Sequence, residues 1–354
     1  MLHAMPIEHI PVSIQTLYAD LTDRARSGDL AELMAGGGAA YSREVRGRLY
    51  WYWQPPTVGG VRPAAKYLGA DGENVRARLE DLRGVADAKR ERVAMVAALR
   101  GARMPTPDAL AGAVLGALSA AGAFRLRAVV VGSVAFQSYP PMLGVRLPEA
   151  MARTGDVDVA EFHSIAMAVD DDLGEDFLTL LRAVDRRFVA VPSPLDGRKT
   201  LRYALRVGLQ ELFSVDVLSP LRGPDRPPLT YLRALRAHGQ LLRFLDFLLY
   251  REVNAVALHG PGVPINVPAP ERFALHKLLV SQFRAETAQS QTKSRKDLAQ
   301  AAALIRVLSQ DRPLELKYAW DELRARGPSW RRKADASLPA LDDDVRRSLL
   351  DAVG

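Results

Sequence analysis

A glycine-serine pair followed by three spaced aspartates constrains this chain more than any other feature. Gly132-Ser133 follows a short apolar run, Asp156-Val157-Asp158 comes next, and Asp216 stands inside the run Phe213–Val217. Because the side chains of a strand alternate between its two faces, both aspartates of the first motif share one face, while Val157 points into a core. The pattern predicts an α/β fold in which three carboxylates on neighbouring strands meet beside the glycine-serine turn.

The glycine-serine turn has the sequence context of a phosphate-binding site. Residues 127–131 predict a buried strand, and a helix over Ser133–Tyr139 is expected to follow it. The first N–H groups of a helix attract an anion, and glycine has no Cβ to block the approach of a phosphate. We expect Gly132 and Ser133 to bind the β- and γ-phosphates of a nucleoside triphosphate. The alternative is a plain strand-to-helix turn.

These motifs, in this order, resemble the DNA polymerase β-like nucleotidyltransferase superfamily. Further stretches look like one bacterial branch of it, the eighth of the numbered NTP-transferase domain families, over roughly residues 30 to 310. The resemblance implies a polymerase β-like α/β (α+β) core with a mixed sheet, and transfer of a nucleoside monophosphate with release of pyrophosphate. A long gap between Ser133 and Asp156 departs from the wider superfamily and can shape an acceptor pocket. The stretches that carry the likeness to the branch are Gly132–Phe136, Leu143–Arg146, Thr154–Asp158, Pro268–Leu278 and Lys296–Leu298.

Nucleotidyl transfer asks the protein mainly to hold metal ions, which align the reacting groups and neutralise developing charge. Carboxylates suit this task because Mg²⁺ prefers oxygen ligands. The resemblance implies two Mg²⁺ (or Mn²⁺) ions, both bound by Asp156 and Asp158, with Asp216 on the ion that activates the acceptor hydroxyl. The alternative is an Asp-x-Asp strand that forms only a solvated edge.

A group of basic residues follows in the C-terminal part of the chain. Lys277 and Arg284 are seven positions apart and therefore line one face of an expected helix. Lys293 and Lys296 come next, and Asp297 can orient a base through a salt bridge. The resemblance implies that these four bases reach the triphosphate, where lysine supplies a point charge and arginine a forked donor. The alternative is a solvated basic face.

The balance of charges permits a polyanionic partner without requiring one. Lys and Arg outnumber Asp and Glu, 48 against 41, which gives a net charge of +7 over 354 residues. The chain has no cysteine, which excludes disulfides, thiolate catalysis and zinc sites of the cysteine type. The N-terminus lacks the pattern of a secretory signal, and the most apolar run, Leu241–Tyr250, is far shorter than the ~20 residues of a membrane span. A cytoplasmic protein without a membrane partner is expected.

Breaks in composition and periodicity predict three parts. Residues 1–104 form an accessory region with a β-hairpin and a long helix, residues 105–268 the catalytic core, and residues 269–354 a helical domain. Thr106-Pro107 is expected to cap and begin the first helix of the core. Helices are expected over 14–35, 72–99, 175–185, 271–284, 294–309, 315–326 and 341–353, and hairpins over 41–54, 200–218 and 254–267.

One face of the first hairpin mixes bases with aromatic rings. The face carries Arg46, Arg48, Tyr50 and Tyr52, and Arg62, Lys66 and Tyr67 follow as residues that extend it. Rings that stack and bases that bind phosphates together suit a single-stranded nucleic acid. The alternative is ordinary hairpin packing, where aromatic alternation is also found.

The sequence predicts a metal-dependent nucleotidyltransferase that uses a nucleoside triphosphate. RNA is the favoured acceptor, with tRNA as its form, because the net charge, the basic-aromatic hairpin and the helical domain all suit a folded polyanion. One alternative is transfer to a protein hydroxyl or a small molecule, as in toxin-like or resistance-like relatives, with a partner protein or antitoxin. Another is a catalytically idle binding module of the same fold. Three converging carboxylates argue against the idle module, which has no physical reason to keep them.

Overall fold

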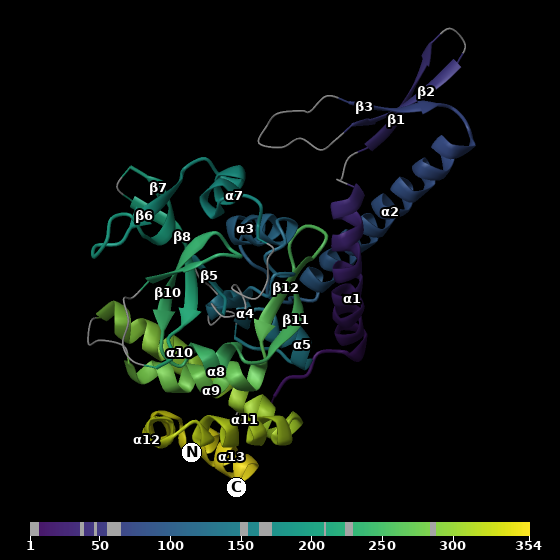
Figure 1. The fold of residues 1–354 in the computed structure, drawn as a ribbon. Coiled ribbons are helices and arrows are strands. Elements are labelled where there is room, and N and C mark those ends of the chain that lie inside the picture. Colours follow the sequence, from purple (N-terminus) through teal and green to yellow (C-terminus); the bar gives the residue numbers. More distant parts are fainter. Residues whose placement is uncertain are drawn as a thin grey trace.

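The chain has a mixed α/β structure, as the sequence predicts. The computed structural model describes residues 7–35, 39–45, 48–54, 65–148, 155–162, 172–208, 210–223, 229–283 and 288–354. A central sheet and the helices around it form the body of the molecule, and two long helices carry a small second sheet away from that body (Figure 1).

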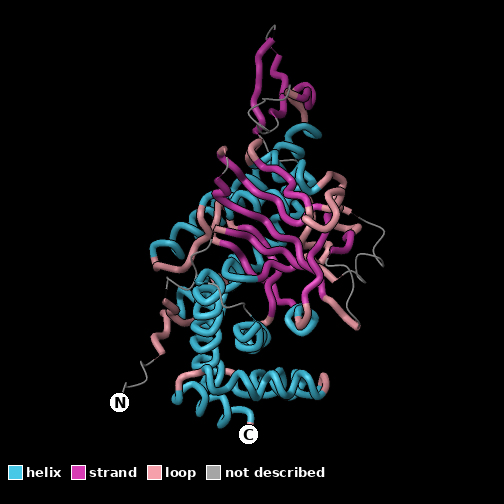
Figure 2. The backbone as a smooth tube through the Cα atoms, turned by 90° about the vertical axis from the view of Figure 1, so that its left-hand side faces the viewer, coloured by secondary structure: helices cyan, strands magenta, loops and turns pink. Residues whose placement is uncertain are grey.

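The central sheet has seven strands. They are β4 (Val129–Val131), β5 (Asp156–Ala160), β6 (Phe188–Pro192), β7 (Thr200–Val207), β8 (Gln210–Pro220), β9 (Leu229–Leu232) and β10 (Ala237–Leu242). The main path runs β4–β5–β8–β10–β9, with β5 and β10 parallel to β8, and β7 pairs antiparallel with the first part of β8 and with β6. Figure 2 shows these strands lying side by side, with helices below them. The mixed sheet is therefore the one that the sequence predicts.

Strand β5 is an alternating strand, as its sequence requires. Val157 and Val159 are fully buried, whereas the two aspartates between and before them remain partly exposed on the other face. Residues 213–219 of β8 are all buried, because this strand has neighbours along both edges and cover on both faces. The polar groups of β8 are consequently enclosed, including Asp216 at 7% exposure.

Helices pack on the sheet and continue below it. They are α3 (Ala109–Ala120), α4 (Gly132–Phe136), α5 (Tyr139–Leu143), α7 (Phe177–Val184), α8 (Leu245–Leu249), α9 (Pro270–Val280), α10 (Ala288–Asp311), α11 (Pro313–Ala325), α12 (Pro328–Ser337) and α13 (Asp343–Val353), with 3₁₀ turns at Ser281–Phe283 and Leu338–Ala340. One hydrophobic cluster extends from Ala111 to Val353, so the helices after residue 268 pack on the same core as the sheet.

Two helix predictions in this region are wrong. The first helix of the core is capped by Asp108, whose carboxylate accepts a hydrogen bond from the N–H of Ala111 at 2.8 Å, and not by Thr106. The helix expected over Ser133–Tyr139 is divided into α4 and α5. Pro140 and Pro141 explain the division, because proline supplies no N–H and fits only the first turn of a helix.

The N-terminal part forms an arm. Helices α1 (Val12–Ala35) and α2 (Glu73–Gly101) pack along each other, and β1 (Ala39–Val45), β2 (Arg48–Gln54) and β3 (Lys66–Ala70) form a three-stranded sheet at their far end (Figure 1). The base of the arm has its own hydrophobic cluster, which includes Leu21, Leu99 and Val256. The hydroxyl of Tyr18 donates to the carbonyl of Val256 at 3.2 Å and accepts from its N–H at 3.1 Å. The arm is thus fixed to the body at its base.

The hairpin that receives the arm consists of β11 (Glu252–Ala257) and β12 (Val263–Pro268), close to the predicted range. Among the described residues, no helix has the length and apolar character to cross a bilayer.

Candidate active site

Strand pairing brings the three aspartates together. Asp158 of β5 lies directly beside Asp216 of the parallel strand β8, and Asp156 lies two positions earlier on the same face of β5. On the other edge, Asp158 is paired with Val131, the last residue of β4 before Gly132. The predicted meeting of the three carboxylates beside the glycine-serine turn is therefore present in the structure.

Burial and the neighbouring carboxylates raise the pKa of two of the three aspartates, Asp158 and Asp216. Burial raises the pKa of Asp158 to about 7, and the neighbouring charges of Asp156 and Asp216 add to this effect. Lys277 and Lys293 act in the opposite direction on the same group. Burial also raises the pKa of Asp216. Such crowding of negative groups is costly unless a cation shares the site.

Arg202 is a site residue that the sequence reasoning missed. Its Nε lies 3.2 Å from Oδ1 of Asp216, and its Nη2 donates to Oδ2 of the same carboxylate at 3.3 Å. Gln240 of β10 also donates to Asp216, at 3.4 Å. The alternating sequence of residues 200–207 puts Arg202 on the polar face of its strand. It does not put Arg202 or Gln240 beside Asp216, because these contacts depend on how β7 and β10 pair with β8.

The donor set is chemically suited to a divalent cation. Carboxylate oxygens are the ligands that Mg²⁺ and Mn²⁺ take, and Asp156 and Asp158 project from one face of one strand. Within the described ranges, however, no group of three or more His, Cys, Asp or Glu side chains is spaced to hold one metal ion. Asp216 is instead engaged by Arg202 and Gln240. Asp156 and Asp158 are thus the carboxylates that are suited to a divalent cation. Metal binding by all three residues stays a prediction.

Gly132 is required by its close contact with Asp158. Its φ is +67°, a left-handed conformation that favours glycine, and a Cβ built on it would lie 2.3 Å from Oδ2 of Asp158. Ser133 follows as the second residue of α4, a helix of five residues. The sequence reasoning assigned the glycine to a phosphate, whereas the contact present in the structure is with the carboxylate.

The predicted bases lie on α9 and α10. Lys277 is largely buried, its Nζ is 2.6 Å from Oδ1 of Asp297, and it stands 5.3 Å above the ring of Phe273. The expected salt bridge with Asp297 is thereby present. Lys293 is exposed near the carboxylates, and burial lowers the pKa of Lys296 while the charge of Asp156 opposes this effect. Arg284 lies outside the described residues.

A cavity of about 810 Å³ begins at this site. Two groups of its lining residues are each held together by direct interactions. Gly132, Asp158 and Lys277 form the carboxylate end, and Phe244 and Trp330 form the aromatic end. Residues of β8, β10 and α9 line the cavity as well. The same cavity is therefore lined by the carboxylate site and by two aromatic rings, one just before α8 and one in α12.

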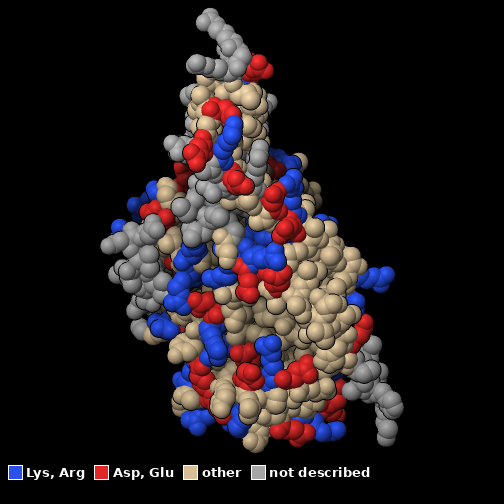
Figure 3. All heavy atoms as spheres, turned by 90° about the vertical axis from the view of Figure 1, so that its right-hand side faces the viewer, with Lys and Arg blue, Asp and Glu red and all other residues tan. Residues whose placement is uncertain are grey.

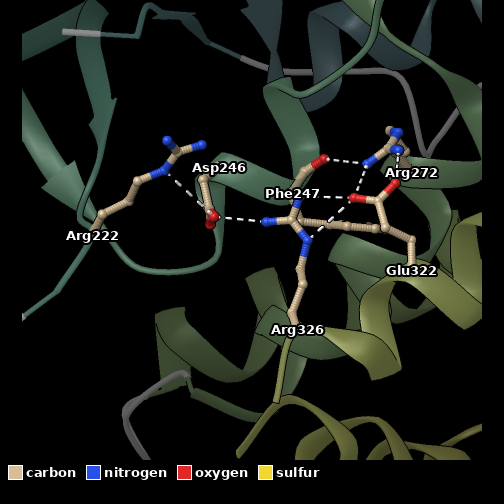
Figure 4. A network of polar contacts seen from close by, with 6 residues as sticks. All are labelled: Arg222, Asp246, Phe247, Arg272, Glu322 and Arg326. Carbon is tan, nitrogen blue, oxygen red and sulfur yellow. Dashed lines mark hydrogen bonds and ion pairs between the residues drawn. The ribbon is translucent and has the colours of Figure 1, made fainter. Parts of the chain in front are cut away.

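Partly buried ion pairs join the helices next to the aromatic end (Figure 4). Arg326, just after α11, contacts Asp246 of α8 at 2.6 Å and Glu322 of α11 at 2.8 Å. Arg272 of α9 pairs with Glu322 and donates to the carbonyl of Phe247 at 3.0 Å. Helices α8, α9 and α11 are thus held together by one polar network, and its Asp246 also lines the cavity.

The basic-aromatic hairpin lies far from this site, at the end of the arm (Figure 1). Tyr52 stacks on its cross-strand partner Tyr41, with ring centroids 5.6 Å apart, which is the packing contact that the alternative reading expects. Arg46 and Arg62 lie outside the described residues. Arg48 falls in β2, and Lys66 and Tyr67 fall in β3. Nucleic-acid binding by the hairpin stays a prediction.

The three aspartates and Gly132 lie within a region that is similar to a known family. Residues 109–325 match the model of a family described as nucleotidyltransferase, and this match covers more than half of the chain. The crystal structure of an antigenic nucleotidyltransferase-like protein from Paracoccidioides brasiliensis is similar at 15% identity and a TM-score of 0.30, over 65% of this chain and 94% of that one. No curated protein matches the chain.

Proposed function

We propose, on the premise that this chain belongs to the nucleotidyltransferase family, that it transfers the nucleoside monophosphate of a nucleoside triphosphate to an acceptor hydroxyl of RNA. The observation that carries the proposal is the side-by-side placement of Asp158 and Asp216, with Asp156 on the same face and Gly132 packed against Asp158. A structural role alone does not account for three clustered carboxylates, two of which, Asp158 and Asp216, have pKa values raised by burial and by neighbouring carboxylates.

The reaction balances as a substitution at the α-phosphorus. A lone pair of the acceptor oxygen forms the new P–O bond, the bond between the α- and β-phosphates breaks, and pyrophosphate leaves with that electron pair. The acceptor proton passes to a base, for which Asp216 is the candidate because its raised pKa suits proton uptake. Arg202 and Gln240 hold the carboxylate of Asp216 in place for this role.

The other residues of the site bind the triphosphate. Asp156 and Asp158 would hold divalent cations, which supply charge neutralisation at the phosphates and lower the pKa of the acceptor hydroxyl. Lys277, positioned by Asp297, lines the cavity, and its positive charge acts on Asp158. Lys293 and Lys296 add positive charge from α10, where their fields already act on the carboxylates.

RNA remains the acceptor that we favour, on the net charge of +7 and the hairpin at the end of the arm. On the face shown in Figure 3, acidic and basic side chains are interspersed. Binding of RNA through that face would therefore rely on local contacts more than on a uniform basic surface. A protein hydroxyl or a small molecule as acceptor, and an idle binding module, are the competing outcomes of the experiment below.

The experiment supplies each of the four α-³²P-labelled nucleoside triphosphates, Mg²⁺ or Mn²⁺, and total cellular RNA. We expect label in RNA that a ribonuclease removes and a protease does not. Asp351→Ala, which changes an exposed carboxylate on α13, serves as the matched control and should transfer at the wild-type rate. Label in protein or in a small molecule would replace the acceptor, and no transfer of any label would support the idle module.

A further inference from the structure

The aromatic end of the cavity is suited to bind a flat aromatic group. Phe244 and Trp330 both line it, with ring centroids 4.6 Å apart and ring planes at 82°. Two rings at nearly a right angle form a corner that a flat aromatic group can fill. Such a group stacks on one ring and meets the edge of the other, and both arrangements are favourable between aromatic systems.

Both rings are held in place by their surroundings. Phe244 has a φ of +68°, a conformation that a bulky side chain rarely adopts and that persists only where neighbouring contacts enforce it. Asp246, two residues later, is fixed by Arg326 at 2.6 Å. The same Arg326 guanidinium lies 5.4 Å from the centroid of the Trp330 ring. A single arginine therefore supports both sides of the corner.

We propose that this corner is the subsite for the nucleobase of the nucleoside triphosphate, an inference that rests on the proposed function and extends it. The phosphates would occupy the end at Gly132, Asp158 and Lys277, and the base the end at Phe244 and Trp330. A volume of about 810 Å³ is within the range of about 300–1,000 Å³ that is usual for small-molecule sites. Lys333, whose Nζ is 5.5 Å from the Phe244 ring, adds a cationic donor at the same end.

The subsite is formed in part outside the region that matches the family. Trp330 and Lys333 belong to α12, beyond residue 325, where the match ends. Choice among bases would accordingly depend in part on a segment outside the region that matches the family. Because stacking energy increases with ring area, the corner should favour a purine over a pyrimidine.

The test measures binding to the full-length protein by titration calorimetry with Mg²⁺ and without acceptor. The probes are ATP, CTP and inorganic triphosphate. We expect ATP to bind more tightly than CTP, and CTP more tightly than triphosphate. Trp330→Leu, which keeps an apolar side chain and removes the ring, should weaken ATP binding on the order of tenfold and leave triphosphate binding unchanged.

Two further variants keep the test decisive. Phe244→Asn removes the other ring and inserts a residue that tolerates positive φ, so it serves if Trp330→Leu does not fold. Tyr318→Leu removes an aromatic ring that is 68% exposed on α11, away from the cavity lining, and should change nothing. Loss of ATP and triphosphate affinity to the same extent in both ring variants would overturn the proposal.

The remaining outcomes distinguish failure of the proposed base subsite from failure of the proposed function. If wild-type protein binds ATP, CTP and triphosphate with equal affinity, the base has no subsite here and the proposal is wrong, while the proposed function stands. If ATP binding survives the loss of either ring and RNA binding falls instead, the corner belongs to the acceptor and the proposal is equally wrong. If wild-type protein binds neither ATP nor triphosphate, the proposed function itself fails.

Discussion

At the scale of single residues, the site depends on how closely Gly132 and Asp158 approach each other. The turn at Gly132 has a positive φ, and the carboxylate of Asp158 occupies the space that any Cβ would need. The position of the Asp158 carboxylate therefore requires glycine in the turn. This explains why a residue without a side chain directly follows β4 at the point where the carboxylates meet.

Gly132→Ala should distort the site, because it strains the backbone of the turn and displaces the carboxylate of Asp158. The new methyl group would lie 2.3 Å from Oδ2 of Asp158, so the carboxylate must move, and alanine also resists the positive φ. We expect a loss of about 1–3 kcal/mol in the free energy of unfolding, together with a large loss of transfer activity. Gly197→Ala, where a Cβ meets nothing within 4 Å, is the control and should have little effect on either quantity. Normal activity in Gly132→Ala would show that the contact has no role.

The raised pKa of Asp158 makes the free energy of unfolding depend on pH. Its pKa rises from 3.8 to about 7, so between these values the folded state binds more protons than the unfolded state. The free energy of unfolding therefore falls as pH rises through this window in the absence of a divalent cation. Asp158→Asn removes the titrating group, so the variant should lose less stability than wild type across the same window.

Urea denaturation in EDTA over a pH series measures this difference. Glu161 is fully buried, and burial raises its pKa to about 8, but it titrates in both proteins and cancels from the comparison. Parallel pH profiles for wild type and Asp158→Asn would contradict the raised pKa of Asp158.

At this scale, the sequence predicted positions within one strand better than contacts that depend on the pairing of several strands. Alternation within one strand was enough to place Asp156 and Asp158 on one face, and the register of β5 with β8 brought Asp216 to them as expected. Arg202 and Gln240 were missed because their contact with Asp216 depends on strand pairings that the local sequence does not encode.

At the scale of elements, a buried ion pair joins α9 to α10. The side chains of Lys277 and Asp297 are 12% and 5% exposed, and their charged atoms are 2.6 Å apart. Removal of one partner leaves the other charge buried without compensation, which is far more costly than the loss of an exposed pair. The pair thus fixes α10, and with it Lys293 and Lys296, beside the carboxylates.

Asp297→Ala should therefore destabilise the protein by about 3–5 kcal/mol. Asp343→Ala is the matched control, because it breaks the exposed pair with Arg346, where Asp343 is 80% exposed, and should cost less than about 1 kcal/mol. Chemical denaturation of both variants gives the two values. A cost for Asp297→Ala as small as that of the control would mean that the pair does not hold α10.

The elements that the sequence predicted are those with strong periodicity. Residues 200–207 alternate and form β7 over the predicted range, and the long charged helix appears as α2. Strands β3, β6, β9 and β10 and helices α8 and α12 were missed, and all of them except α12 have six residues or fewer. For β10, a glycine in its sequence also weakens the strand signal.

At the scale of the whole molecule, the arm and the cavity are separate features. The cavity is lined by residues from Val131 to Lys333, which only the complete fold brings together, so the sequence alone could not predict it. The arm carries its sheet away from this cavity (Figure 1). An acceptor that contacts both must be large, as a folded RNA is.

Replacement of residues 36–72 by a short glycine-serine linker tests the role of the arm's tip. The linker would join α1 to α2, which already pack along each other, and should leave ATP and triphosphate binding unchanged. RNA affinity should fall and its dependence on salt should weaken, because phosphate contacts and the counterions that they release are lost. Binding isotherms for RNA over a salt series provide the measurement. Unchanged RNA affinity would contradict RNA binding by the hairpin and favour the alternative of ordinary packing.

The central claim is that Asp156, Asp158 and Asp216 form the site of nucleotide transfer. Its most direct test is the rate of pyrophosphate release and label transfer by Asp156→Ala, Asp158→Ala and Asp216→Ala, each compared with wild type and Asp351→Ala. We expect each of the three variants to lose transfer while its melting temperature holds or rises, because each removal also relieves charge repulsion. Transfer at the wild-type rate by any one of them would remove that carboxylate from the mechanism and contradict the account.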